Sequence, residues 1–187
     1  MHHYVDIQLR RDPEITEVQL MAALFAKLHR ALVFMPASRI AVSFPGYGLA
    51  PPRLGNCLRL IGAEEDLQGL VASSWLGGML DHVKLDPIAP VPLTTEFRTL
   101  RRVQAKSSPE RLRRRHMRRH GISEAEANQR VPDDAAERLS LPFLHVASGS
   151  TGQHFRLFLR LGPASSTPEI GAFDAYGLSA RASIPWF

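Results

Sequence analysis

The sequence has 187 residues, of which 44% are hydrophobic and 22% are charged, and its formal net charge is +5. This length and composition exclude a wholly disordered chain and suit one large domain or two small ones. The single cysteine, Cys57, excludes an internal disulfide and a thiolate zinc site, and it favours a reducing compartment. Charged residues interrupt the most apolar stretch, residues 20–34, and the first residues do not resemble a secretory signal. We therefore expect a cytoplasmic protein that does not span a membrane.

The first half of the chain alternates strand patterns with helix patterns. Apolar and polar side chains alternate over residues 4–9, whereas residues 16–34 place their large apolar side chains on one helical face. The predicted elements are, in order, strand 4–9, helix 16–34, strand 39–44, loop 46–56, strand 57–61, a helix opening at the acidic residues 64–66, and strand 82–85. The order β-α-β-β-α-β predicts an α+β fold with a ferredoxin-like domain over residues 1–94.

A proline-rich link, residues 86–97, leads into a smaller predicted C-terminal domain, residues 95–187. Its chief element is a helix over residues 109–120. Ser107 and Glu110 have the spacing of a capping box, and Gly121 can end the helix in a left-handed conformation. Ser123 and Glu126 repeat the capping-box spacing, which predicts a second short helix. Short antiparallel strands are expected after it, among them residues 154–161 and 173–178.

The positive charge is concentrated around the first of these helices. Residues 98–120 contain ten lysines and arginines and one acid, whereas the rest of the chain has thirteen basic and seventeen acidic residues. Such a concentrated charge repels itself unless something neutralises it, which indicates a polyanionic partner. The alternative is a solvated helix face or a flexible basic arm.

The spacing of the arginines suits a nucleic-acid backbone. At 100° per residue one helical face carries Arg111, Arg114, Arg115, Arg118 and Arg119. Guanidinium groups bind phosphates bidentately, and this helix has no apolar face to bury. It also lacks the Asn, Gln and Ser side chains that usually read B-DNA bases, which favours structured RNA. Arg102 and Gln104, just upstream, could grip a guanine and an adenine, or they could contact the backbone only.

Several motifs in a fixed order identify a family. They are residues 102–107 (RVQAKS), 109–115 (PERLRRR), 117–120 (MRRH), 150–158 (STGQHFRLF), 176–179 (YGLS) and 185–187 (PWF). Together they resemble the CRISPR-associated repeat endoribonucleases of type I-F systems, which cut the repeat hairpin of precursor CRISPR RNA. The resemblance extends over essentially the whole chain.

The resemblance implies a metal-independent reaction without a cofactor. In it the ribose 2′-OH attacks the adjacent phosphate at the base of the hairpin, which leaves a 2′,3′-cyclic phosphate and a 5′-OH. By the same resemblance His29 is the general base or proton-transfer residue, Ser148 positions the 2′-OH, and Tyr176 helps to orient His29. The protein is then expected to keep its product and to join a type I-F surveillance complex guided by the mature CRISPR RNA.

The resemblance also names the residues that would bind RNA. Arg102 and Gln104 would read bases at the foot of the stem, and Phe155 would stack on the terminal base pair. The full set of candidate RNA-binding residues is Arg102, Gln104, Ser107, Arg111, Arg114, Arg115, Arg118, Arg119, His120, Ser150 and Phe155.

The residues alone support only part of this chemistry. The sequence shows no metal-ligand motif, and a nuclease without a metal can use the 2′-OH of RNA as its nucleophile and a histidine for proton transfer. Taken without the family, however, each of the eight histidines reads more simply as a solvated or core imidazole. An alternative function therefore remains, in which the chain is a non-catalytic subunit that binds an RNA hairpin and helps to assemble a ribonucleoprotein.

Overall fold

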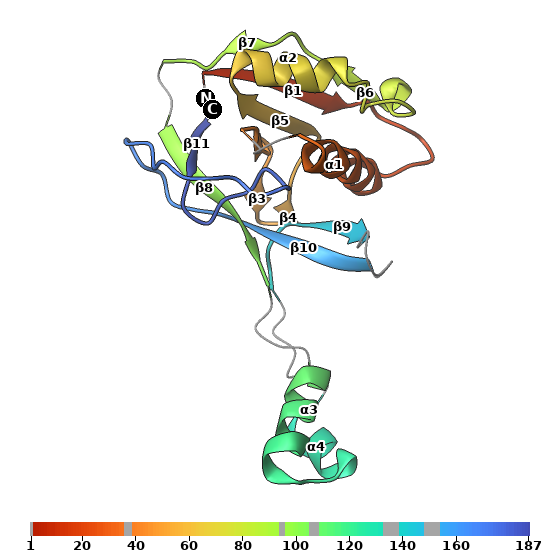
Figure 1. Ribbon diagram of the computed structural model, residues 1–187. Helices are drawn as coiled ribbons and strands as arrows, with labels where there is room; N and C mark the ends of the chain where they lie inside the picture. Colours follow the sequence, from red (N-terminus) through yellow and green to blue (C-terminus); the bar gives the residue numbers. More distant parts are fainter. Residues whose placement is uncertain (1, 36–38, 94–95, 105–108, 133–138, 148–153) are drawn as a thin grey trace. The chain divides into compact units, whose positions relative to one another are not determined.

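The computed structural model describes residues 2–35, 39–93, 96–104, 109–132, 139–147 and 154–187 (Figure 1). It divides into two compact units, one of residues 1–102 together with 141–187, and one of Val103–Ser140. Helices and antiparallel sheets are both present, so the α+β class is confirmed. The expected division into domains 1–94 and 95–187 remains a prediction.

The first sheet has the element order that the sequence predicts. Its core elements are β1 (His3–Leu9), α1 (Glu17–Val33), β2 (Ala41–Ser43), β5 (Cys57–Gly62), α2 (Glu64–Ala72) and β6 (Val83–Leu85). The strands are ordered β2-β5-β1-β6, every neighbouring pair is antiparallel, and β7 (Ala89–Pro90) also pairs with β1. The β-α-β-β-α-β order agrees with the prediction, and the ferredoxin-like assignment itself stays a prediction.

Short elements fill the connections of this sheet. The stretch predicted as a loop, residues 46–56, contains a hairpin of two-residue strands, β3 (Gly48–Leu49) and β4 (Pro52–Arg53). A short 3-10 helix, η1 (Leu80–His82), precedes β6.

The helix α1 begins and packs as its sequence predicts. The Thr16 hydroxyl accepts a hydrogen bond from the Gln19 amide, and the Gln19 side chain accepts one from the Thr16 amide, which completes a capping box. Its apolar face is buried in the core through Leu20, Met21, Leu24, Phe25, Leu28 and Leu32. A fixed, buried α1 gives a rigid support for any residue near its C-terminal end, where His29 lies.

The second sheet comes from the C-terminal half of the chain. Its strands are β8 (Glu96–Val103), β9 (Phe143–Ala147), β10 (His154–Leu161) and β11 (Ser183–Trp186), in the order β11-β8-β10-β9. The predicted strand at 154–161 is confirmed, with Leu157 and Leu159 buried.

The predicted strand at 173–178 is wrong, because these residues form a turn. The Asp174 carboxylate accepts hydrogen bonds from the amides of Tyr176 and Leu178, at 2.8 Å and 3.0 Å. Gly177 has a φ of +70°, which L side chains rarely adopt. The apolar and aromatic side chains in this stretch indicated a strand, and the turn-forming Asp174 and Gly177 overrode that pattern.

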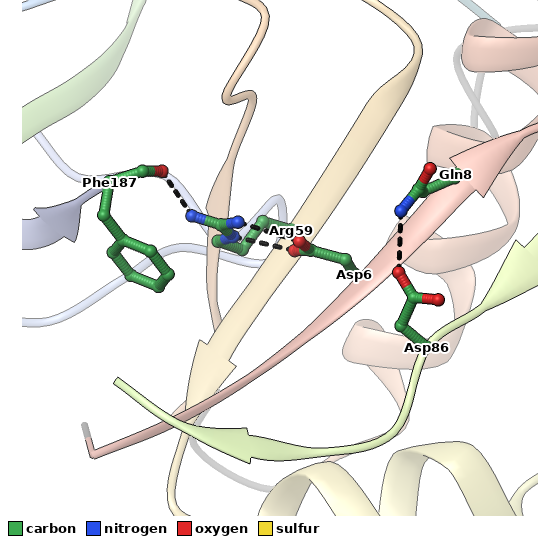
Figure 2. Close-up of polar contacts among 5 residues, drawn as sticks. All are labelled: Asp6, Gln8, Arg59, Asp86 and Phe187. Carbon is green, nitrogen blue, oxygen red and sulfur yellow. Dashed lines mark hydrogen bonds and ion pairs between the residues drawn. The ribbon is translucent and has the colours of Figure 1, made fainter. Parts of the chain in front are cut away.

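The C-terminal residue is anchored on the first sheet by an arginine (Figure 2). Arg59 and Asp6 are directly paired on β5 and β1, and the Arg59 guanidinium bonds both Asp6 carboxylate oxygens, at 2.7 Å and 2.8 Å. Arg59 also donates to the backbone carbonyl of Phe187 and lies 3.9 Å from the centre of the Phe187 ring. Beside this cluster, the Gln8 amide donates to Asp86 at 2.7 Å. The arginine thus joins the end of the chain to its first strand.

The described residues of the second unit form two short helices, α3 (Pro109–His120) and α4 (Glu124–Arg130). Gly121 ends α3 with a φ of +62°, and Ser123 and Glu126 form the predicted capping box of α4. Arg113 of α3 donates to the carbonyl of Val131, 2.8 Å away, just beyond α4. None of the helices in the described parts of the chain is both long enough and apolar enough to cross a membrane.

Candidate functional site

His29 is held by a backbone carbonyl from the other end of the chain. Its ring is half-buried near the end of α1, and its Nδ1 lies 2.8 Å from the carbonyl oxygen of Ala175. A carbonyl oxygen can only accept a hydrogen bond, so Nδ1 must carry a proton. In the neutral ring Nε2 is then the nitrogen with the free lone pair, and it is the one that can accept a proton. This arrangement prepares one defined nitrogen for proton transfer.

Tyr176 covers one face of that imidazole. The rings of His29 and Tyr176 are stacked, with their centroids 3.9 Å apart and their planes at 8°. The Tyr176 ring is also parallel to that of Phe25, one helical turn before His29, at a centroid distance of 6.0 Å. Tyr176 therefore limits how the imidazole can rotate. The structure brings these two predicted residues together.

The turn that carries Tyr176 is attached to both sheets. The Val42 amide of β2 donates to the Gly177 carbonyl at 2.9 Å, and the Ser179 amide donates to the Leu100 carbonyl of β8 at 3.1 Å. A Cβ on Gly177 would lie 2.6 Å from a methyl carbon of Val42, so only glycine fits there. The position of Tyr176 is thus fixed by backbone bonds as well as by ring stacking.

Arg102 and Phe155, both candidate RNA-binding residues, form a second pair in the structure. Arg102 lies on β8 and Phe155 on the neighbouring β10, and the guanidinium carbon is 5.3 Å from the centre of the Phe155 ring. Arg102 is exposed and Phe155 is half-buried. An exposed guanidinium over an aromatic ring offers hydrogen-bond donors and a stacking surface side by side, which suits nucleobases. Gln104, exposed, follows the end of β8 by one residue.

The helix α3 presents all of its arginines except Arg113 to solvent. No residue of α3 is buried. The exposed residues include all six candidates on this helix: Arg111, Arg114, Arg115, Arg118, Arg119 and His120. Arg114 is 3.8 Å from the Glu110 carboxylate, an exposed pair of little energetic consequence. The half-buried side, turned away from these arginines, is formed by Leu112, Arg113, His116 and Met117.

Three candidates lie outside the described residues, namely Ser107, Ser148 and Ser150. Ser148 directly follows β9, which ends at Ala147. Among the residues that the structure describes, no three His, Cys, Asp or Glu side chains gather as a metal site would require.

The single cysteine is a poor nucleophile in this environment. Burial, and next the negative charge of Asp6, raises the pKa of the Cys57 thiol to about 12. Cys57 therefore stays protonated at neutral pH, and the thiolate needed for covalent catalysis is not formed there.

Sequence reasoning missed the groups that hold the imidazole. The Ala175 carbonyl belongs to the backbone, so the identity of the residue does not indicate its role. Asp174 and Gly177 are common turn formers, and their spacing of three residues was the available signal. That signal competes with the apolar alternation of the same stretch.

Comparisons with known proteins agree with the motifs. The chain is 53% identical to the CRISPR-associated endonuclease Cas6/Csy4 of Pseudomonas aeruginosa strain UCBPP-PA14, over 187 residues and the full length of both chains. It is 44% identical, again over both full lengths, to the CRISPR-associated endonuclease Cas6/Csy4 of Escherichia coli strain UTI89 / UPEC. The model of the family described as CRISPR-associated protein (Cas_Csy4) matches residues 4–187. These matches confirm the resemblance, and the chain belongs to the Cas_Csy4 family of CRISPR-associated proteins.

Proposed function

We propose that the chain is an endoribonuclease that cleaves the repeat hairpin of precursor CRISPR RNA at the base of its stem. The observation that carries the proposal is the imidazole of His29, held at Nδ1 by the Ala175 carbonyl and stacked on Tyr176. Two relatives of full length carry the name CRISPR-associated endonuclease, which supports a nuclease rather than a binding subunit.

The reaction needs no group beyond RNA and protein. The 2′-oxygen of the nucleotide before the cleavage site bonds to the adjacent phosphorus, and the bond from phosphorus to the 5′-oxygen of the next nucleotide breaks. His29 takes the proton of the 2′-OH through Nε2, or otherwise moves the proton during the step. The departing 5′-oxygen takes a proton from water and becomes a 5′-OH, His29 returns its proton to solvent, and the other fragment ends in a 2′,3′-cyclic phosphate. Ser148 holds the 2′-OH in line with the bond that breaks.

The basic residues supply binding affinity and fix the position of the RNA stem on the protein. The exposed side chains of Arg115, Arg118 and Arg119 neutralise successive phosphates of the stem, together with Arg111, Arg114 and His120. Arg102 and Gln104 read base edges near the cleavage site, and the ring of Phe155 stacks on the last base pair. With so many contacts the product stays bound, and the protein then enters the type I-F surveillance complex with its RNA.

Cleavage of the cognate repeat RNA in EDTA tests this function. We expect purified protein to cut the hairpin at one position, and end-group analysis to find a 2′,3′-cyclic phosphate and a 5′-OH. Cleavage that stops in EDTA would contradict the metal-independent step. Tight binding without any cleavage would favour the alternative, a non-catalytic hairpin-binding subunit.

A further inference from the structure

We propose that Asp174 is a positioning residue that determines which nitrogen of His29 carries the proton. It does so by holding the peptide unit between Ala175 and Tyr176 in one orientation. The expected effect of Asp174 on cleavage rests on the proposed function of His29. The expected effect of Asp174 on the position of the His29 proton rests on the hydrogen bonds alone.

One peptide unit makes both of the bonds concerned. Its carbonyl, from Ala175, accepts from His29 Nδ1 at 2.8 Å. Its N–H, from Tyr176, donates to the Asp174 carboxylate at 2.8 Å. In a trans peptide the carbonyl and the N–H point in opposite directions. Holding the N–H at Asp174 therefore directs the carbonyl at His29.

The opposite orientation of this peptide unit would move the proton of the neutral His29 ring from Nδ1 to Nε2. A flipped peptide would present the Tyr176 N–H to Nδ1, and Nδ1 would then have to accept a hydrogen bond and lose its proton. In that state Nε2 carries the proton of the neutral ring, and it cannot act as a base. An ionised carboxylate only accepts hydrogen bonds, so Asp174 stabilises the orientation that leaves Nε2 unprotonated.

Beyond the Tyr176 N–H, the Asp174 carboxylate accepts only one more hydrogen bond that the structure describes, from the Leu178 amide at 3.0 Å, and the other bonds of the turn join backbone atoms. The Asp174 amide donates to the Leu178 carbonyl at 2.8 Å, and the Gly177 amide donates to the Asp174 carbonyl at 2.8 Å. The bond from the Val42 amide to the Gly177 carbonyl also joins backbone atoms only. Removing the carboxylate should therefore free the Tyr176 and Leu178 amides, while the three backbone bonds keep the turn closed.

Asp12 offers a matched control. Its half-buried carboxylate also accepts two backbone hydrogen bonds, from the amides of Glu14 and Ile15 at 2.8 Å and 2.9 Å, and it lies 3.2 Å from His82. It lies before the start of α1, whereas His29 lies near the end of that helix. Like Asp174→Ala, the Asp12→Ala variant therefore removes one carboxylate and its two hydrogen bonds from backbone amides. It does so away from the imidazole of His29.

The direct test is the protonation of His29 in the free protein, measured by ¹⁵N NMR about two pH units above the ordinary histidine pKa of about 6.5. We expect the wild-type ring to carry its proton on Nδ1. We expect Asp174→Ala to shift protons to Nε2, Asp174→Asn to restore the wild-type state through its amide oxygen, and Asp12→Ala to change nothing. An Asp174→Ala ring still fully protonated on Nδ1 would overturn the proposal.

Cleavage provides the second readout. In single-turnover assays we expect Asp174→Ala to lower the rate about tenfold, the scale of losing one hydrogen bond, with hairpin affinity unchanged. Asp174→Asn should recover most of the rate, and Asp12→Ala should match the wild type. A wild-type protein that never cleaves would overturn the proposed function, and the NMR result would still decide the role of Asp174. If the Asp174→Ala variant cleaves at the wild-type rate although its His29 proton has moved to Nε2, the proposed link between Asp174 and catalysis is overturned.

Discussion

The Tyr176 ring lies flat against the imidazole of His29, with 3.9 Å between their centroids and 8° between their planes. This contact joins a turn near the end of the chain to the first long helix. Because the Ala175 carbonyl holds Nδ1 at the same time, both the tilt of the ring and its hydrogen-bonding edge are fixed. This fixed orientation suits the proton transfer that we propose for His29.

The stacking contact predicts that the aromatic ring of Tyr176 matters more than its hydroxyl. Tyr176→Phe keeps the parallel ring, so we expect its single-turnover cleavage rate to stay within about threefold of wild type. Tyr176→Ala removes the ring and frees the imidazole, so we expect a loss of about tenfold or more, on the scale of a mispositioned general base. Equal losses in the two variants would show that the hydroxyl, and not the stack, carries the role.

The exposed arginines of α3 predict a steep salt dependence of RNA binding. With roughly six phosphate contacts, the logarithm of the binding constant should fall against the logarithm of salt concentration with a slope of about −4 to −5. Arg115→Ala and Arg119→Ala should each flatten the slope by about one unit. Arg11→Ala, which removes an exposed arginine outside α3, is the control and should leave the slope unchanged. A wild-type slope near zero would remove α3 from the interface.

The position of Arg102 beside Phe155 predicts base discrimination at the foot of the stem. Arg102→Ala should cost about 1–3 kcal/mol in binding of the cognate hairpin and should relax the preference at one base pair. Arg102→Lys keeps the charge and loses the planar fork, so we expect it to recover little of that preference. Competition binding between the cognate hairpin and one with that pair changed provides the measurement. A uniform loss across both hairpins would indicate a phosphate contact instead.

The anchor of the C-terminus predicts a large effect on stability. Arg59 is only 8% exposed, so Arg59→Met leaves Asp6 without its partner in the interior. We expect the free energy of unfolding to fall by about 3 kcal/mol, measured by urea denaturation. Adding Asp6→Leu should recover part of the loss, because it removes the unpaired charge.

The ion pair of the exposed Lys84 with the half-buried Asp86 is the control for that measurement. The Lys84 side chain is 62% exposed, so Lys84→Met should change the free energy of unfolding by less than about 1 kcal/mol. An Arg59→Met variant no less stable than Lys84→Met would contradict the anchoring role of Arg59.

Periodicity and capping signals predicted most of the elements. The apolar face of α1 defines that helix locally, the box of Ser123 and Glu126 begins α4, and Gly121 marks the end of α3. The sequence analysis predicted a strand at residues 173–178 because apolar side chains alternate there. The turn that forms instead depends on hydrogen bonds that the Asp174 carboxylate accepts and on contacts with distant strands, which the local pattern does not show. The pairing of β11 with β8 likewise depends on contacts between segments far apart in the chain.

The candidate site was predicted unevenly for similar reasons. The arginines of α3 follow from charge and helical spacing alone, since no tertiary contact is needed to expose them. His29 and Tyr176 are chemically unremarkable in the sequence, and only the resemblance to the family singled them out. Their stacking, and the bond to the Ala175 carbonyl, arise from the packing of the turn against α1, which no local pattern encodes.

The central claim, that the RNA supplies its own nucleophile and His29 moves the proton, is tested most directly by changing one atom of the substrate. The repeat hairpin is prepared with a single 2′-deoxyribose just before the cleavage site, and its binding and single-turnover cleavage are compared with those of all-RNA. We predict equal affinity and no cleavage of the deoxy hairpin, and for His29→Ala a retained affinity with all-RNA cleavage lowered by about 10²-fold or more. A deoxy hairpin cut as fast as all-RNA would contradict the account.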